Sequence, residues 1–185
     1  MGVRHDQSAI ASCFHSDYDR LISLDVTLKE TKKMFEIKNV FGKTIFSSPT
    51  ARNAQDAVIE SFREEVSLFE VDLSGANLYS MNFAGVNLAG ANMQGANLSS
   101  ANFKFAKLNG ANFKKANLSW ASMKNAILTW ADLSNAKCFG TDFRGANLAR
   151  ARLVGTYLTR ASLAGANLRD VDFGEGGEPD QSSEG

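Results

Sequence analysis

The stretch "GVNLAGANMQGANLSSANFKFAKLNGANFKKANLSW", residues 85–120, repeats one pattern every five residues. A helix returns to the same face about every 3.6 residues and a strand every two, so neither element could bury such a pattern. Stepping by five from Leu68 to Phe173 gives 22 positions, and every one of them is apolar. The chain must therefore turn once in each repeat, and this period decides the fold.

Two further columns accompany the apolar one. The residue two places before it is Ala in 15 repeats, and the residue directly before it is Asn or Asp in 14. If each repeat forms one side of a coil that closes after four sides, both the large and the small residue point inward. The small residue is then needed because four sides converge on one narrow axis. We predict coils stacked about 4.8 Å apart, as backbone-paired strands are.

This order of Ala, then Asn or Asp, then Leu or Phe, then two variable residues resembles the pentapeptide-repeat family, as in "ANFKK" (111–115) and "ADLSN" (131–135). The resemblance covers residues 66–175. It implies an all-β solenoid, a right-handed quadrilateral β-helix of about five coils. Residues 20 apart then share one side, so Leu68 is expected to stack on Leu88.

The sequence divides into three predicted parts. Residues 1–65 are expected to form strands and one helix that cap the solenoid, because an open first coil would present unpaired backbone groups. Residues 66–175 form the β-helix. Residues 176–185 are rich in Gly, Ser and acidic residues and predict a flexible tail.

Within the N-terminal part we predict three elements. Residues 21–28 alternate apolar and polar residues as a strand does, while roughly the first 18 residues show no period and are expected to be disordered. A hairpin is predicted with Gly42 in its turn. A helix is predicted to follow, with Ser48 as its N-cap and Pro49 as its first residue.

Composition and charge exclude several classes of protein. The chain has 185 residues, and its 20 basic and 20 acidic residues cancel. No apolar run approaches the ~18 residues of a membrane span, and no secretory signal is recognisable. Cys13 and Cys138 fit no metal or disulfide framework, which favours a reducing compartment, so we predict a cytoplasmic protein that makes no membrane contact.

The residues available for catalysis are sparse. Histidine occurs only as His5 and His15, and Cys138 falls in the inward column. The acidic residues of one column lie two and three coils apart, too far for an acid and base pair: Asp72, Asp132 and Asp172. The glycines of "GVNLAG" (85–90) follow the five-residue period, and this segment does not resemble a phosphate-binding loop. We predict a protein that is not an enzyme, with no cofactor and no metal site.

The surface of the predicted solenoid is mildly basic. Residues 66–175 contain eleven basic and seven acidic residues, a net charge of +4. One basic column is spaced by 20 residues and is continued around the adjoining corner by Phe105 and Lys107. Its members are Lys104, Lys124 and Arg144. Such a stripe could contact an acidic protein surface or a nucleic-acid backbone, or it could simply be solvated.

Large aromatic residues occupy outward positions as well. Trp120 and Trp130 lie ten residues apart, which places them on opposite corners of a coil, and Trp120 is expected to lie near Phe139 of the next coil. Exposed Trp is a common anchor at protein interfaces. These residues complete the candidate interaction surface.

Three functions remain open. We favour a protein-protein interaction module with an unknown partner. The best known role in the family, an acidic mimic of DNA that binds a type II topoisomerase, is the alternative, and the basic surface disfavours it. Nucleic-acid binding through the basic stripe is the third and is also disfavoured. End-to-end homodimerisation is a further hypothesis, in which the last coil, with Val171 and Phe173, stacks on a second copy.

Overall fold

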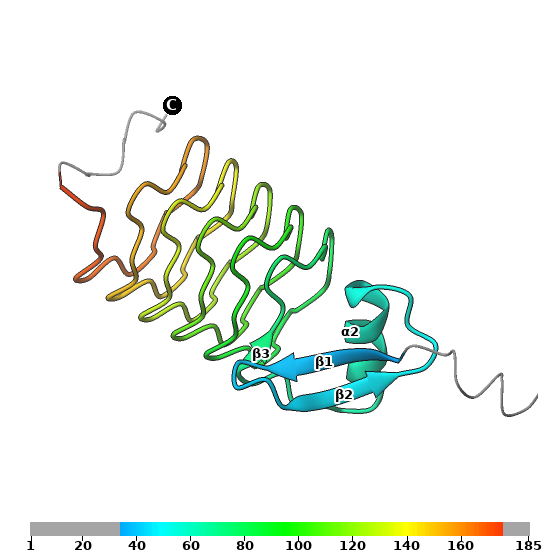
Figure 1. The fold of residues 1–185 in the computed structure, drawn as a ribbon. Helices are drawn as coiled ribbons and strands as arrows, with labels where there is room; N and C mark the ends of the chain where they lie inside the picture. The colour runs from blue at the N-terminus through cyan, green and yellow to red at the C-terminus, as the bar shows by residue number, and fades with distance from the viewer. Residues whose placement is uncertain (1–33, 176–185) are drawn as a thin grey trace, which may run out of the picture. The chain divides into compact units, whose positions relative to one another are not determined.

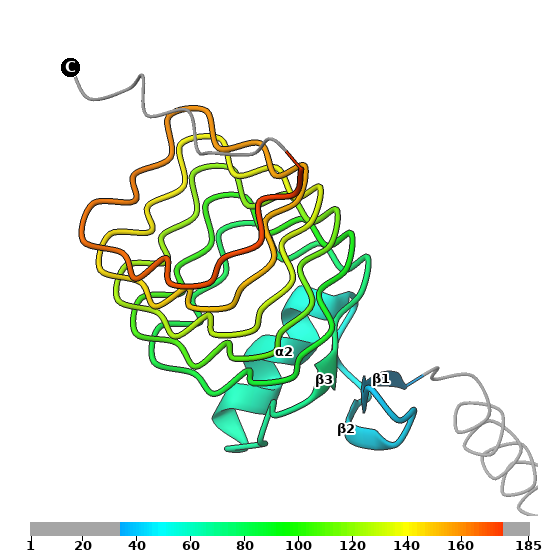
Figure 2. The same ribbon diagram turned by 90° about the vertical axis from the view of Figure 1, so that its left-hand side faces the viewer.

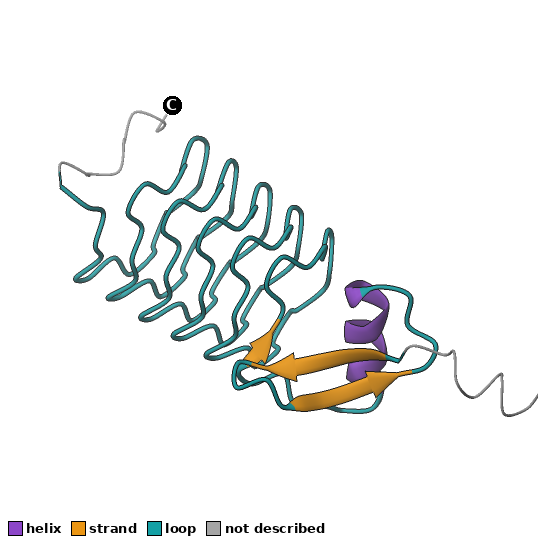
Figure 3. Ribbon diagram, in the orientation of Figure 1, coloured by secondary structure: helices purple, strands orange, loops and turns teal. Residues whose placement is uncertain are grey.

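The computed structural model describes residues 34–175 (Figure 1). The predictions made for the first 33 residues and for the tail lie outside this part. Strands β1 (Phe35–Asn39) and β2 (Thr44–Ser48), helix α2 (Ala54–Arg63) and strand β3 (Val71–Asp72) come first (Figure 3). β1 is the central strand of a three-stranded sheet of order β2-β1-β3 and pairs antiparallel with both neighbours.

β1 and β2 form the hairpin that the sequence predicts. Ile37 is paired with Phe46, and both side chains are buried. Gly42 in the connection has φ +79°, a left-handed conformation that glycine adopts without steric cost. The Asn39 side chain fixes the turn, because its Oδ1 accepts hydrogen bonds from the backbone N–H groups of Phe41 (3.1 Å) and Lys43 (2.9 Å).

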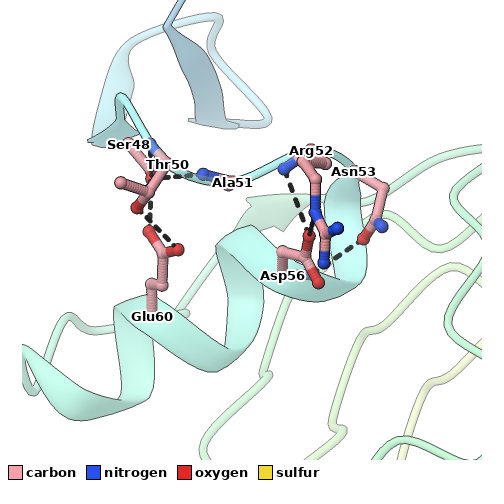
Figure 4. Close-up of polar contacts among 7 residues, drawn as sticks. All are labelled: Ser48, Thr50, Ala51, Arg52, Asn53, Asp56 and Glu60. Atoms are coloured by element: carbon pink, nitrogen blue, oxygen red, sulfur yellow. Dashed lines mark hydrogen bonds and ion pairs between the residues drawn. The ribbon is translucent and has the colours of Figure 1, made fainter.

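Helix α2 begins five residues later than predicted, so the assignment of Ser48 as its N-cap was wrong. Asn53 is the N-cap, and its Oδ1 accepts the N–H of Asp56 at 2.8 Å (Figure 4). Ser48 ends β2 instead, and its Oγ accepts the N–H groups of Thr50 (3.0 Å) and Ala51 (2.8 Å). The Oγ of Ser48, which would have capped the predicted helix, therefore stabilises the turn after β2 instead.

The same turn is held against the helix. The hydroxyl groups of Ser48 and Thr50 both donate hydrogen bonds to the carboxylate of Glu60 (Figure 4). Ala57, Val58 and Ser61 make up the buried side of the helix. Residues 35–63 are thus hydrogen-bonded to one another, and their buried side chains belong to the same core as those of the repeats.

From β3 onward the chain winds as a four-sided solenoid (Figure 2). Seventeen parallel bridges join residues that are 20 positions apart, as between Asn77 and Asn97. The hydrogen bonds between the coils alternate in direction: the N–H of Leu73 donates to Asn92 O, while the N–H of Asn92 donates back to Val71 O, each at 2.8 Å. A separation of 20 residues with a period of five gives four sides in each coil.

Each side ends in a tight turn of fixed geometry. In one of these turns, the N–H of Ala76 donates to Leu73 O at 3.2 Å across Ser74 and Gly75. All 21 residues at the position of Gly75, from Glu70 to Asp170, have φ between +54° and +71°. A positive φ at the third position is the requirement of a type II turn, which favours Gly or Asn there.

The interior consists of the two inward columns. Ala91, Ala96 and Leu98 are fully buried, as the narrow axis requires. Like residues stack as predicted: the Phe83 and Phe103 rings lie parallel with their centroids 5.0 Å apart. At the C-terminal end of the solenoid the inward side chains of Leu163, Leu168 and Phe173 are only partly buried, so the core is exposed there.

The Asn column has a hydrogen-bonding cause. The Oδ1 of Asn97 accepts the backbone N–H of Ser99 at 3.3 Å, which fixes the start of the turn. Its Nδ2 donates to Asn77 Oδ1 of the preceding coil at 2.9 Å. One side chain therefore satisfies a turn and links two coils. An Asp can accept from the next coil, as Asp72 Oδ1 does from Asn92 Nδ2 at 3.0 Å, but it cannot donate to the preceding one.

Candidate interaction surface

The predicted basic column exists as a stack, but its charges are not equivalent. The N–H of Phe105 donates to Lys124 O at 3.1 Å, so Lys104 and Lys124 follow each other on one corner, with Arg144 one coil further. All three side chains are exposed. Arg144 is engaged in a double hydrogen bond with Asp142, from Nε to Oδ1 and from Nη2 to Oδ2, each 2.8 Å long.

This ion pair has an electrostatic consequence. The Arg144 guanidinium, through its hydrogen bonds, holds the pKa of Asp142 below its ordinary value, although partial burial opposes the shift. The charge of Arg144 is therefore largely compensated on the surface. Within residues 34–175, Lys104 and Lys124 have no ion-pair partner within 4.0 Å, although the charge of Lys124 also contributes to lowering the pKa of Asp142.

Phe105 and Lys107 lie beside this column. Phe105 follows Lys104 in the turn and is 64% exposed, and Lys107 lies on the next side, bridged to Asn87 and Ile127. Ile127 is itself 40% exposed. This corner therefore combines lysine ammonium groups with apolar side chains that the core does not use.

Trp130 lies on a different corner. Its ring is 63% exposed, and the Arg150 guanidinium carbon lies 4.9 Å from the ring centroid, in a cation-π arrangement. Arg150 Nε is also 3.6 Å from Asp170 Oδ2. Trp130, Arg150 and Asp170 thus form a column that runs over three coils.

Trp120 and Phe139 lie in contact, as their spacing predicts. Their ring centroids are 5.2 Å apart and the rings are nearly perpendicular. The Arg160 guanidinium lies over Phe139, 5.5 Å from its centroid. Trp120 and Trp130 do not share a corner, so the predicted candidates form separate groups.

Three residues on the coils that follow Trp120 were not predicted from the sequence: Lys137, Tyr157 and Arg160. Lys137 and Tyr157 replace Asn or Asp in their column and are bridged to each other, and Tyr157 is 64% exposed. The replacement of Asn or Asp at these two positions was the feature of the sequence that could have identified them. A bulky or charged residue at this position does not form the hydrogen bonds that join Asn side chains of successive coils, and its side chain projects from the side of the solenoid.

The acidic residues of the solenoid are mostly neutralised in pairs. Each of four Asp residues lies within 3.6 Å of a basic group on the same or a neighbouring coil. The pairs are Asp132 with Lys114, Asp142 with Arg144, Asp170 with Arg150, and Asp172 with Arg152. The acidic residues of 66–175 that lie outside these pairs, Glu70, Asp72 and Glu175, fall in different columns of residues spaced by 20.

Residues 34–175 contain few side chains suited to catalysis. Cys138 is fully buried, and burial raises the pKa of its thiol to about 12, although Thr141 opposes the shift. Residues 34–175 contain no group of three metal-binding side chains. A hollow of about 340 Å³ is lined by Lys114, Lys115 and Arg152, among others, and Lys114 and Arg152 are paired with Asp residues. Within this range, no helix has the length and hydrophobicity needed to cross a bilayer.

Comparison with known proteins agrees with this architecture. The model of the family "Pentapeptide repeats" matches residues 67–104, 101–137 and 136–174. The chain therefore belongs to the pentapeptide-repeat family, whose members form a right-handed quadrilateral β-helix and are in general non-enzymatic scaffolds. No curated protein matches the chain significantly.

Three solved structures illustrate the likeness. The pentapeptide-repeat protein Rfr23 from the cyanobacterium Cyanothece 51142 is 24% identical, with a TM-score of 0.50, over 63% of this chain and 97% of its own. A pentapeptide-repeat protein of the Arabidopsis thaliana thylakoid lumen is 33% identical, with a TM-score of 0.46, over 59% and 72%. QnrB1, a plasmid-mediated fluoroquinolone resistance protein, is 23% identical, with a TM-score of 0.38, over 52% and 62%.

Proposed function

We propose that this protein is a non-enzymatic interaction module that binds a partner protein through aromatic side chains at its corners. One observation carries the proposal: Phe105, Trp120 and Trp130 occupy left-handed turn positions, with φ between +61° and +62°. All three residues are more than half exposed, so packing in the core does not account for the presence of aromatic residues at these positions.

The cost of these residues supports a role at the surface. A side chain other than Gly in the left-handed region costs about 1 kcal/mol, and nine of the 21 equivalent turn positions are Gly. An exposed aromatic ring at such a position adds strain, and more than half of the surface of each of these three residues remains in water. Because twelve of the 21 positions carry a residue other than Gly, the strain alone does not distinguish these three. Their exposed aromatic rings do, since Trp is enriched among the residues that dominate binding energy.

The paired acids weigh against the topoisomerase alternative. A mimic of duplex DNA needs ordered, uncompensated negative charge. Asp132, Asp142, Asp170 and Asp172 are all held in ion pairs. We therefore retain the protein-binding module as the proposed function.

We further infer that residues 35–65 cap the first coil of about five. β1 pairs with β3 through Asn39 and Val71, and the Phe62 ring meets the Phe83 ring edge-on with centroids 6.0 Å apart. Both contacts cover the first coil, where an open end would otherwise expose strand edges. The partly buried last coil supports the hypothesis of end-to-end pairing with a second copy.

The test is an affinity capture with the tagged protein from its own cells. The variant carries Phe105→Gly, Trp120→Gly and Trp130→Gly, because Gly suits the left-handed backbone and should preserve the fold. The control carries Ser80→Gly and Ser100→Gly at two equivalent turns. We expect one protein to be retained by the wild type and the control and lost from the aromatic variant.

A charge variant tests the basic column separately. Lys104→Glu and Lys124→Glu reverse its two unpaired cations. Retention of the same protein by all variants would contradict a role for the corners. Retention of topoisomerase subunits by all of them would establish the alternative function instead.

A further inference from the structure

We propose that Trp120, Lys137, Phe139, Tyr157 and Arg160 form a preorganised docking surface for an acidic segment of a partner protein. We call these five residues the aromatic patch. The inference rests on the proposed function, because it specifies which surface of the module binds and what chemistry it recognises.

Backbone pairing brings the five residues together. Asn117, Lys137 and Tyr157 are bridged in succession, so they occupy one side of the solenoid on three consecutive coils. The N–H of Trp120 donates to Phe139 O at 2.8 Å, which places these two residues at the end of that side. The patch therefore spans about 10 Å along the solenoid axis, at the usual spacing of paired strands.

The ring of Trp120 is held in place before any partner binds. It lies against the backbone of Gly140, where any larger residue would collide with its Cε3 and Cζ3 atoms. Phe139 meets it edge-on, and Arg160 lies over Phe139. Side chains that are already ordered lose little conformational entropy on binding, so more of the contact energy appears as affinity.

The patch is also suited in composition to binding. Trp120 is 58% exposed and Tyr157 is 64% exposed, while Phe139 is partly exposed between them. Trp, Tyr and Arg are the residues most enriched among those that dominate protein interfaces. A partner that covers this surface would remove large apolar areas from water at a rigid site.

Charge defines the partner. The outward positions on this side, from Asn77 to Arg160, include no Asp or Glu. Lys137 and Arg160 have no ion-pair partner within residues 34–175. Asp142, which follows on the next side, is bound to Arg144. Complementarity therefore calls for carboxylates on the partner, together with apolar groups for the rings.

A protein segment suits the patch better than a single-stranded nucleic acid. Nucleic acids are held by a groove of several cations along the backbone and by bases that stack on open aromatic faces. The patch has two cations. One face of Trp120 is covered by Gly140, and one face of Phe139 is covered by Arg160.

Panning of a displayed random dodecapeptide library against the full chain tests the recognition chemistry. Binders that persist on a Trp120→Gly, Arg160→Ser variant are removed by counterselection. We expect the remaining peptides to be enriched in Asp and Glu combined with aliphatic or aromatic residues. Their affinity should fall at least tenfold in a Lys137→Glu, Arg160→Glu variant, whose exposed substitutions leave the fold intact by circular dichroism. The matched control is Lys115→Glu on another corner.

Two results would overturn the inference. One is the recovery of no patch-dependent peptide, or only of peptides without acidic enrichment. The other is tighter binding of a 20-nucleotide oligo(dT) probe that is lost in the same Lys137→Glu, Arg160→Glu variant.

The cellular capture separates this inference from the proposed function. If the captured protein is lost from a Phe105→Gly, Trp130→Gly variant and retained by Trp120→Gly, the module binds through other corners and the aromatic patch is refuted. If no corner variant loses it, the proposed function fails as well. Loss from Trp120→Gly and from Lys137→Glu, Arg160→Glu supports both.

Discussion

Trp120 and Gly140 are 20 residues apart and depend on each other: Cε3 of Trp120 lies 2.5 Å from the point where a Cβ atom on Gly140 would stand. This distance is far below a normal contact between carbon atoms, so the ring occupies its position only because residue 140 has no side chain. The backbone of Gly140 also has φ +63°.

We therefore predict that Gly140→Ala both destabilises the solenoid and displaces the indole. The left-handed strain alone should cost about 1 kcal/mol in the free energy of unfolding. Urea unfolding measures this cost, and Trp fluorescence in a Trp130→Phe background reports on Trp120. Gly110→Ala is the control, because Gly110 has φ +68° and no atom lies within 4 Å of the point where its Cβ atom would stand. An unchanged Trp120 emission in Gly140→Ala would contradict the contact.

Replacing Phe105 by Gly is expected to leave the free energy of unfolding nearly unchanged. At Phe105, Gly relieves the left-handed strain but increases the entropy of the unfolded chain by a similar amount. We expect the free energy of unfolding of Phe105→Gly to remain within about 0.5 kcal/mol of the wild type. Phe103→Ala is the contrast, since removing a fully buried Phe should cost about 3–5 kcal/mol. Equal losses in the two variants would show that Phe105 has a structural role.

Cys138 should resist thiol reagents as long as the protein is folded. The thiolate is the reactive form, and burial raises the pKa of this thiol to about 12. In a Cys13→Ser background, which leaves Cys138 as the single thiol, we expect negligible labelling by iodoacetamide at pH 8. Full labelling should appear in denaturant. Rapid labelling of the native protein would place Cys138 outside the core.

The Asp142–Arg144 pair predicts a contribution to acid denaturation. The folded-state pKa of Asp142 is lowered, so its carboxylate contributes stability above the unfolded pKa of about 3.9. That contribution is lost as the pH falls through the lower, folded-state pKa. Asp142→Asn and Arg144→Gln should each reduce the difference in urea midpoint between pH 7 and pH 3. A wild-type difference in both variants would show that the pair makes no contribution.

Much of the fold follows from the five-residue period, because stacking depends on it at every coil. The stack of Phe83 on Phe103 and the burial of Cys138 are direct consequences. The hairpin around Gly42 was equally predictable, since its turn chemistry is local. The start of helix α2 was not, because Ser48 and Asn53 are both good caps. In the folded chain the Ser48 hydroxyl donates to Glu60, from a later turn of the helix, and this contact is not visible in the local sequence.

The candidate surface was predictable only in part. The contact between Trp120 and Phe139 follows from the coil length, but their partner Arg160 lies a further coil away and was not identified. The pairing of Arg144 with Asp142 was also missed, although the two are near neighbours in sequence. Charge counts cannot reveal it, because they do not say which ions face each other.

The 20-residue register sets a rule for how this chain can change in length. Insertion of one extra repeat between Trp120 and Lys137 would leave the interior satisfied, because every repeat offers the same inward residues. It would nevertheless carry Phe139, Tyr157 and Arg160 a quarter turn around the axis, away from Trp120. Only whole-coil insertions would keep them in line. The packing of the interior is thus compatible with any number of inserted repeats, whereas the alignment of outward side chains is kept only when the insertion is a multiple of four repeats.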